Sequence, residues 1–273
     1  MAYPDSDFPM RPCFAYGSNM NPDTFQDRCP GSRVLGRAVL VDHRWRIHGR
    51  GVATVVPHSN SRVPGVLLGL SAIDEAGLDE AEGVASHVYR REFLSVKSLD
   101  GTWTRALVYV ANDASEGAPR PGYLERVVAG ARHHALPRSH VRELESWRQG
   151  PPAPGSGRFP VFVYGTLKRG QWNHGLLDDA GFVGGAVTAN RHALRLDGLP
   201  MLDRHTAHSQ VHGELYLVSQ ETLQSLDQLE GHPDFYRRSV EPVILGDGSI
   251  EWAWIYFHTC PTGRVIESGR YGD

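Results

Sequence analysis

Short apolar segments, each bounded by glycine, proline or polar residues, recur along the whole chain. Segments of this kind are typical of β-strands. The first half of the chain predicts strands at Cys13–Tyr16, Arg33–Val41, Val63–Leu70, Glu92–Leu99 and Thr104–Val110. The second half predicts strands at Pro160–Tyr164, Phe182–Thr188, Val211–Val218, Arg238–Leu245 and Glu251–His258. Each half therefore carries enough strands for a small sheet or barrel of its own.

A short helix is predicted between the third and fourth strands of each half. The two helices span Ser71–Ala81 and Ser219–Leu229, and each opens with a serine that an acid or amide follows closely, which favours an N-cap. The first half adds a helical tail at Tyr123–His134 and Arg138–Arg148. These elements predict an α+β fold of mixed or antiparallel β-barrels with peripheral helices.

The two halves repeat one another in register. The segment FAYGSN resembles the later segment FVYGTL, and their glycines, Gly17 and Gly165, lie 148 residues apart. The same spacing joins Gly65 with Gly213, Leu78-Asp79 with Leu226-Asp227, and Glu82-Gly83 with Glu230-Gly231. The spacing then shortens by one residue and joins Tyr89-Arg90-Arg91 with Tyr236-Arg237-Arg238, and Ala106–Tyr109 with Ala253–Tyr256. An ordered series of this kind predicts two tandem copies of one domain.

A segment rich in proline and glycine separates the two copies. Residues 150–158 include the run GPPAPGSG, which favours neither a helix nor a β-ladder and indicates a semi-rigid linker. The predicted domains are residues 11–149, which include the helical tail, and residues 159–273.

The composition is that of an ordinary globular protein. Of the 273 residues, 40% are hydrophobic and 22% are charged, and the net charge of −3 indicates no partner of the nucleic-acid or anionic-lipid class. No apolar run approaches the roughly 20 residues of a membrane span, and residues 1–12 lack the pattern of a secretion signal. Three cysteines are too few for a disulfide framework, so we expect a cytoplasmic protein.

A glycine turn and a later glutamate are the strongest chemical signals in each copy. The Tyr-Gly turn after the first strand exposes backbone N–H groups that can hold a carboxylate, although an ordinary strand-ending turn is the alternative. Glu82 and Glu230 each follow the turn glycine by 65 residues and end a helix whose apolar face would bury them. Burial raises the pKa of a carboxyl group towards neutrality, as a general acid/base requires. A glutamate that merely precedes a C-capping glycine is the alternative.

Tyr89 and Tyr236 follow these glutamates at the start of the next strand. Each can hydrogen-bond a polar group of a substrate, although an aromatic residue at this place also suits the core. The pairs Arg90-Arg91 and Arg237-Arg238 are expected to be split by strand alternation, which gives them a surface or structural role.

These residues resemble the γ-glutamylcyclotransferase superfamily over nearly the whole chain. The sequence YGSN at residues 16–19, Glu82-Gly83 and Tyr89 are similar to the γ-glutamylcyclotransferase branch, and residues 121–137 resemble its C-terminal helical extension. The sequence YGTLK at residues 164–168, Glu230-Gly231 and Tyr236 resemble the γ-glutamylamine cyclotransferase branch. That branch includes the AIG2-like plant proteins and the butirosin-type deprotecting enzyme.

The resemblance implies mixed β-barrel enzymes that need no metal or cofactor. They would release 5-oxoproline and a free amine from a small-molecule γ-glutamyl substrate. Glu82 and Glu230 would be the general bases, with Glu80 as a rival carboxylate in the first copy. The resemblance implies that the glutamyl pocket is lined by Tyr16, Gly17, Ser18, Asn19, Tyr89 and Tyr123 in the first copy, and by Tyr164, Gly165, Thr166, Leu167 and Tyr236 in the second.

Several alternatives remain at this point. One or both copies could bind a γ-glutamyl or amino-acid ligand without turning it over, and in a hybrid only one copy would be catalytic. The leaving amine could be an amino acid, lysine, a polyamine or a protected antibiotic intermediate of aminoglycoside type, and the protein a monomer or a homodimer. A metal site is not expected, because the spacing of His205, His208 and His212 is too loose.

Overall fold

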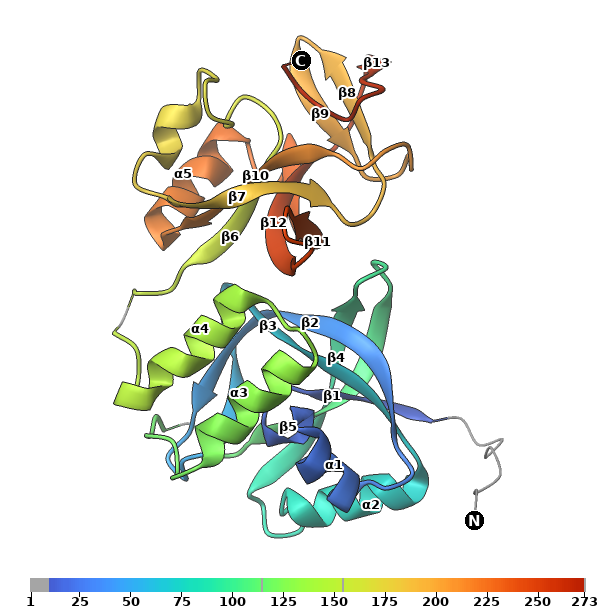
Figure 1. Cartoon of the computed structure of the whole chain (residues 1–273), viewed down its shortest axis with the longest axis vertical. Helices are drawn as coiled ribbons and strands as arrows, with labels where there is room; N and C mark the ends of the chain where they lie inside the picture. Colours follow the sequence, from blue (N-terminus) through green and yellow to red (C-terminus); the bar gives the residue numbers. More distant parts are fainter. Residues whose placement is uncertain (1–9, 114, 154, 273) are drawn as a thin grey trace. The chain divides into compact units, whose positions relative to one another are not determined.

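The computed structural model describes residues 10–113, 115–153 and 155–272, which belong to two compact units, Met1–Pro152 (unit 1) and Ala153–Asp273 (unit 2). The described residues do not include residue 154 of the predicted linker or residue 273 at the end of the second predicted domain. They also do not include residues 1–9, which form most of the segment that lacks the pattern of a secretion signal. Each unit is built on a closed barrel of five strands with helices at its periphery (Figure 1). The predicted α+β fold of two tandem barrels is therefore confirmed.

The barrel of unit 1 has the strand order β1-β3-β2-β4-β5. All neighbouring strands are antiparallel except β1 and β5, which pair in parallel at Cys13 and Leu107 and so close the barrel. Buried side chains such as Phe14, Leu40 and Leu68 form its core. The strands are β1 (Arg11–Ala15), β2 (Arg33–Ile47), β3 (Ala53–Leu70), β4 (Tyr89–Ser98) and β5 (Trp103–Ala111).

The barrel of unit 2 repeats this order as β6-β10-β7-β11-β12. Its single parallel pairing, between β6 and β12 at Val161 and Trp254, again closes the barrel. The repeat in the sequence is thus a repeat in strand topology. The strands are β6 (Phe159–Val163), β7 (Gly181–Thr188), β10 (His212–Val218), β11 (Tyr236–Leu245) and β12 (Ile250–His258).

The units differ where the second and third strands run beyond the barrel. In unit 1, β2 and β3 remain paired as one long hairpin as far as Ile47 and Ala53. In unit 2 the corresponding stretch forms two short strands, β8 (Ala193–Asp197) and β9 (Leu199–Asp203). They make a separate sheet with β13 (Arg264–Val265) from the end of the chain. The apolar pattern predicted neither the longer hairpin nor the separate sheet, because both lie outside the regular spacing that marked the barrel strands.

The two helices between the third and fourth barrel strands begin at their predicted caps. Ser71 and Asp74 form a capping box at α2 (Ala72–Ala81), and Ser219 caps α5 (Gln220–Leu229). The predicted tail of unit 1 forms α3 (Tyr123–His133), α4 (Arg138–Ser146) and η2 (Trp147–Gln149), with α3 packed against α4 (Figure 1). The pattern did not predict η1 (Ser18–Met20), α1 (Pro22–Arg28) or η3 (His174–Leu177). None of the helices in the described part of the chain is long and apolar enough to cross a membrane.

Candidate active sites

Each predicted catalytic glutamate stands at the C-terminal end of a helix. Glu82 is the C-cap of α2 and Glu230 is the C-cap of α5, and both keep a helical backbone conformation. The glycines that follow, Gly83 and Gly231, have φ angles of 65° and 58°, in the left-handed region that glycine adopts without steric cost. The chain therefore turns away directly after each glutamate, and the two carboxylates leave their helices at equivalent positions.

An aspartate one turn earlier fixes each helix end to the barrel wall. In unit 2, Arg238 on β11 donates to the Asp227 carboxylate from Nε at 2.7 Å and from Nη2 at 3.0 Å, and the Tyr256 hydroxyl on β12 donates to it at 2.7 Å. Two-pronged, charge-assisted hydrogen bonds fix geometry as well as contributing energy. The last turn of α5, and with it Glu230, is held against the wall in this way. Unit 1 repeats the cluster with Asp79, Arg91 and Tyr109.

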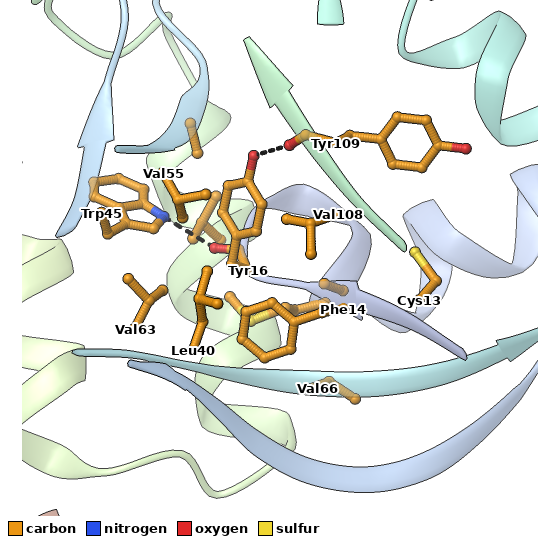
Figure 2. Packing of buried hydrophobic residues seen from close by; sticks show 14 of the residues in the cluster. Cys13, Phe14, Tyr16, Leu40, Trp45, Val55, Val63, Val66, Val108 and Tyr109 are labelled. Atoms are coloured by element: carbon orange, nitrogen blue, oxygen red, sulfur yellow. Dashed lines mark hydrogen bonds between the residues drawn. The ribbon is translucent and has the colours of Figure 1, made fainter. Parts of the chain in front are cut away.

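The tyrosine of each turn is anchored inside its barrel. The Tyr16 hydroxyl donates to the backbone carbonyl of Tyr109, and the Trp45 indole donates to the carbonyl of Tyr16 at 2.9 Å (Figure 2). The Tyr164 hydroxyl repeats the first contact, to the carbonyl of Tyr256 at 2.8 Å. Burial raises the pKa of Tyr16 and Tyr164 well above the usual range, so both hydroxyls remain protonated donors. The turn that follows each tyrosine is thereby fixed on the barrel.

The residues after each tyrosine carry unsatisfied backbone N–H groups. Among the described residues, the N–H groups of Gly17 and Asn19 in unit 1 and of Thr166 and Leu167 in unit 2 reach no acceptor within the protein. Successive N–H groups of a turn form an anion-binding arrangement. Each turn can therefore hold a carboxylate or a developing oxyanion.

The cavity of unit 1 has a volume of about 370 Å³. Two tyrosines hold the backbone of Ala53 at its edge: the Tyr89 hydroxyl donates to the Ala53 carbonyl at 2.5 Å, and the Tyr123 hydroxyl accepts from the Ala53 N–H at 3.0 Å. The rival carboxylate, Glu80, is exposed and does not line the cavity. The cavity brings together all the predicted site residues of this unit, Tyr16, Gly17, Ser18, Asn19, Glu82, Tyr89 and Tyr123.

The cavity of unit 2 is smaller, with a volume of about 180 Å³. The Tyr236 hydroxyl donates to the Pro200 carbonyl at 3.0 Å, which repeats the contact of Tyr89 with Ala53 in unit 1. No arginine or lysine stands among the described residues that line this cavity. It brings together all the predicted site residues of this unit, Tyr164, Gly165, Thr166, Leu167, Glu230 and Tyr236.

Two polar neighbours act on the carboxylate of Glu82. The Asn19 amide donates to Glu82 Oε1 at 2.8 Å, and Arg28 Nη1 lies 3.7 Å from the same oxygen while donating to Asn19 Oδ1 at 2.7 Å. Burial raises the pKa of Glu82 above the usual range, whereas Asn19 and Arg28 lower it. The ionised form of Glu82 is thus partly stabilised although the side chain is only 14% exposed.

Glu230 has no such neighbours in the part of the chain that the structure describes. The register of the repeat places Leu167 and Leu176 where unit 1 has Asn19 and Arg28. No described side chain hydrogen-bonds to the Glu230 carboxylate, and burial alone raises the pKa of Glu230 to about 7. A carboxyl group that titrates near neutral pH is well suited both to take up a proton and to return it.

Sequence reasoning missed two features of these sites. One is the set of arginines in the unit 1 cavity, which come from separate elements and share no motif. The other is the cluster in which Asp79 or Asp227 binds an arginine and a tyrosine of the barrel wall, here called the aspartate clamp. The register of the repeat had already paired Leu78-Asp79 with Leu226-Asp227. The arginines that line the cavity are Arg28, Arg50, Arg120 and Arg126.

Within the described ranges, no three His, Cys, Asp or Glu side chains form a group that could hold a metal ion. His208, one of the three clustered histidines, instead pairs with Glu267 at 2.9 Å. Cys13 also lines the unit 1 cavity, but burial raises the pKa of its thiol far above neutrality. The thiol therefore stays protonated and is not an activated nucleophile.

Known proteins similar to this chain match both units. Residues 161–273 match the family "Gamma-glutamyl cyclotransferase, AIG2-like" and residues 62–144 match the "AIG2-like family". A Methanocaldococcus jannaschii protein provisionally named a gamma-glutamylcyclotransferase is 40% identical over 114 residues, which are 41% of this chain and 95% of that protein. Mouse gamma-glutamylcyclotransferase is 28% identical over 146 residues, 49% of this chain and 76% of that protein. The chain belongs to the γ-glutamylcyclotransferase superfamily, as a tandem of two of its domains.

The similarity extends to relatives from the amine-specific branch. Bovine gamma-glutamylaminecyclotransferase is 43% identical over 100 residues, which are 33% of this chain and 60% of that protein. Relatives from both branches of the superfamily are thus similar to parts of one polypeptide.

Proposed function

We propose that both units are γ-glutamyl cyclotransferases, which release 5-oxoproline and a free amine from γ-glutamyl compounds. One observation carries this proposal: in each unit a buried glutamate of raised pKa shares a cavity with a turn of unsatisfied N–H groups. The cyclotransferase names of relatives at up to 43% identity support it.

The proposed reaction uses a nucleophile that the substrate itself carries. The α-amine attacks the γ-carbonyl carbon and forms the new C–N bond of a five-membered ring, and the bond from that carbon to the leaving amine breaks. Glu82 or Glu230 takes a proton from the α-ammonium group and gives it to the departing nitrogen. The second proton, which the ring nitrogen loses when it becomes the lactam N–H, passes to the released amine, which leaves as an ammonium ion, so the glutamate ends in its starting state. Because both reacting groups belong to one folded substrate, their effective concentration is high.

The turns and tyrosines supply the positioning for this reaction. The N–H groups of Gly17 and Asn19, or of Thr166 and Leu167, bind the α-carboxylate and stabilise the developing oxyanion. Each cavity is lined both by its turn, which follows the first barrel strand, and by its glutamate, which stands at the end of a helix. The glutamyl half of the substrate lies between them.

The cavity rims favour different leaving amines. In unit 2 the exposed side chains of Leu199, Leu229 and Phe235 line the cavity, and the described lining has no cation, so an amine with no carboxylate on the carbon next to its nitrogen fits best. Lysine side chains, polyamines and a γ-glutamyl-protected aminoglycoside intermediate share this chemistry, and deprotecting such an intermediate in the cytoplasm would be the same reaction. Unit 1, with its arginines, fits γ-glutamyl amino acids.

The proposal is tested by 5-oxoproline release from γ-glutamyl-alanine and from γ-glutamyl-lysine joined through the lysine side chain. Glu82→Gln and Glu230→Gln are measured singly and together. Removing a general base should lower kcat by about 100-fold or more in the unit that carries it. Glu80→Gln, which changes an exposed carboxylate two residues from Glu82, is the matched control and should keep its activity.

Full activity of the double variant would overturn the assignment of the bases. Binding of these substrates in calorimetry without any product from the wild-type chain would instead identify a binding protein.

A further inference from the structure

Three exposed arginines that line the unit 1 cavity have no carboxylate partner among the described residues. Arg50 lies in the turn between β2 and β3, Arg120 lies just before α3, and Arg126 lies in the first turn of α3. Within the described part of the chain none of the three forms an ion pair, whereas nearby Arg44 and Arg46 both pair with Glu116. Unpaired guanidinium groups on one cavity form a site for anions.

The backbone brings Arg50 and Arg120 close together at the cavity. The Arg120 backbone N–H donates to the Gly51 carbonyl at 2.9 Å, which ties the loop before α3 to the turn that carries Arg50. Both arginines act on the Tyr89 hydroxyl, where they oppose the burial that raises its pKa. Arg50 and Arg120 therefore lie near Tyr89. Arg28, which belongs to α1, instead contacts Asn19 and Glu82.

The start of α3 adds positive potential at the same place. Tyr123, the first residue of α3, lines the cavity, and Gly122 provides no side chain to cap the helix. An uncapped helix N-terminus carries a partial positive charge, to which Arg126 adds and which Glu125 in the same turn opposes. Unit 2 has no counterpart, since its described lining residues include no arginine and it lacks the α3 extension.

We propose that Arg50, Arg120 and Arg126 form a subsite for a leaving amine with two carboxylates, so that unit 1 prefers γ-glutamyl derivatives of acidic amino acids. The inference rests on the proposed cyclotransferase function of unit 1. A leaving amino acid with one carboxylate would leave much of this positive charge uncompensated, whereas a dicarboxylate can engage two guanidinium groups at once. The side-chain carboxylate of the leaving amino acid then contributes to binding in addition to the α-carboxylate.

The test compares two isosteric dipeptides, γ-glutamyl-glutamate and γ-glutamyl-glutamine, which differ only in a carboxylate and an amide. The Glu230→Gln chain is used, so that only unit 1 turns substrate over. We expect kcat/KM to be about tenfold higher for γ-glutamyl-glutamate, with a preference that falls as salt is added. Arg120→Gln and Arg126→Gln should each bring the ratio towards one. Arg142→Gln removes an exposed arginine of α4 outside the cavity and should leave the ratio unchanged.

Equal kcat/KM values for the two dipeptides in the parent chain would overturn the subsite. A ratio that Arg120→Gln and Arg126→Gln leave unchanged would also overturn it. If neither dipeptide yields 5-oxoproline, the proposed function of unit 1 fails, and calorimetry with the same two dipeptides then decides the subsite separately. Tighter binding of γ-glutamyl-glutamate that the two variants abolish would support the subsite, and equal affinities would exclude it.

Discussion

The Asn19 amide donates a 2.8 Å hydrogen bond to the Glu82 carboxylate, and the matching position in unit 2 is Leu167. Arg28 adds a positive charge 3.7 Å from the same carboxylate. The helix end, the glycine that follows and the aspartate clamp are alike in the two units. Asn19 and Arg28 are therefore what distinguishes the surroundings of Glu82 from those of Glu230. Glu82 has partners that favour its ionised form, whereas burial alone acts on Glu230 and raises its pKa to about 7.

Exchanging these neighbours should shift the pH profile of each unit. Asn19→Leu in the Glu230→Gln chain removes the hydrogen bond that lowers the pKa of Glu82, so the pH of half-maximal kcat should rise. Leu167→Asn in the Glu82→Gln chain is the reciprocal change and should lower the corresponding pH. Rates of 5-oxoproline release across pH measure both shifts. Profiles that do not move would show that these residues do not tune the bases.

Glu230 should make the stability of unit 2 depend on pH. Its pKa is higher in the folded protein than in the unfolded chain, so its contribution to stability is present in acid and is lost as the pH rises through about 7. Above that pH the fold holds a buried charge at a cost of at most roughly 3 kcal/mol. Glu230→Gln should therefore be more stable than wild type at about pH 8.5 and similar to it at about pH 5.

Urea denaturation at both pH values measures this effect. Asp179→Asn, which removes an exposed carboxylate of the same unit, should leave the difference between the two pH values unchanged. An equal gain from Glu230→Gln at both pH values would contradict the buried-charge explanation.

A methyl group at either turn glycine should displace the turn. In Gly165→Ala the new Cβ would lie 2.6 Å from Pro200 Cγ, and in Gly17→Ala it would lie 3.0 Å from the Tyr123 hydroxyl. We expect a loss of about 1–3 kcal/mol in stability and at least about tenfold in kcat/KM for the unit concerned, with the larger effect at Gly165. Gly185→Ala meets no atom within 4 Å and is the matched control. Substrate turnover and denaturation curves together test this prediction.

Loss of the clamp should misplace the glutamate of unit 2. Asp227→Asn weakens the contacts with Arg238 and Tyr256, and it removes a charged partner of the Arg238 guanidinium, whose side chain is only 6% exposed. We expect unit 2 to lose about 2–4 kcal/mol of stability. In the Glu82→Gln chain, kcat should fall more than KM rises, because Asp227 orients the base rather than binding substrate. Arg237→Gln changes an exposed neighbour and should have little effect; a rise in KM alone would assign Asp227 to substrate binding.

Much of the architecture could be predicted because it depends on local patterns repeated at a fixed spacing. The apolar segments predicted the barrel strands, and Ser71 and Ser219 predicted the starts of α2 and α5. The two glutamates stood out because each precedes a glycine at the same distance from a turn. These signals are local, so one sequence is enough to show them.

The features that escaped prediction depend on contacts between distant segments. Arg120 and Arg126 line the cavity only because α3 packs beside the barrel, and Arg28 reaches Glu82 only through α1, which the apolar pattern did not indicate. The clamp at Asp227 likewise needs two strands that follow it in the sequence. Such arrangements arise from tertiary packing, which hydrophobic periodicity does not encode.

The pair of leucines in place of Asn19 and Arg28 has a consequence for the protein as a whole. One polypeptide carries the same proposed base in two settings: polar neighbours favour the charge of Glu82, whereas no described side chain hydrogen-bonds to Glu230. Two carboxyl groups with different neighbours respond differently to the acidity of the surroundings. The duplication thus gives a single gene product two proposed sites whose protonation is set by separate surroundings.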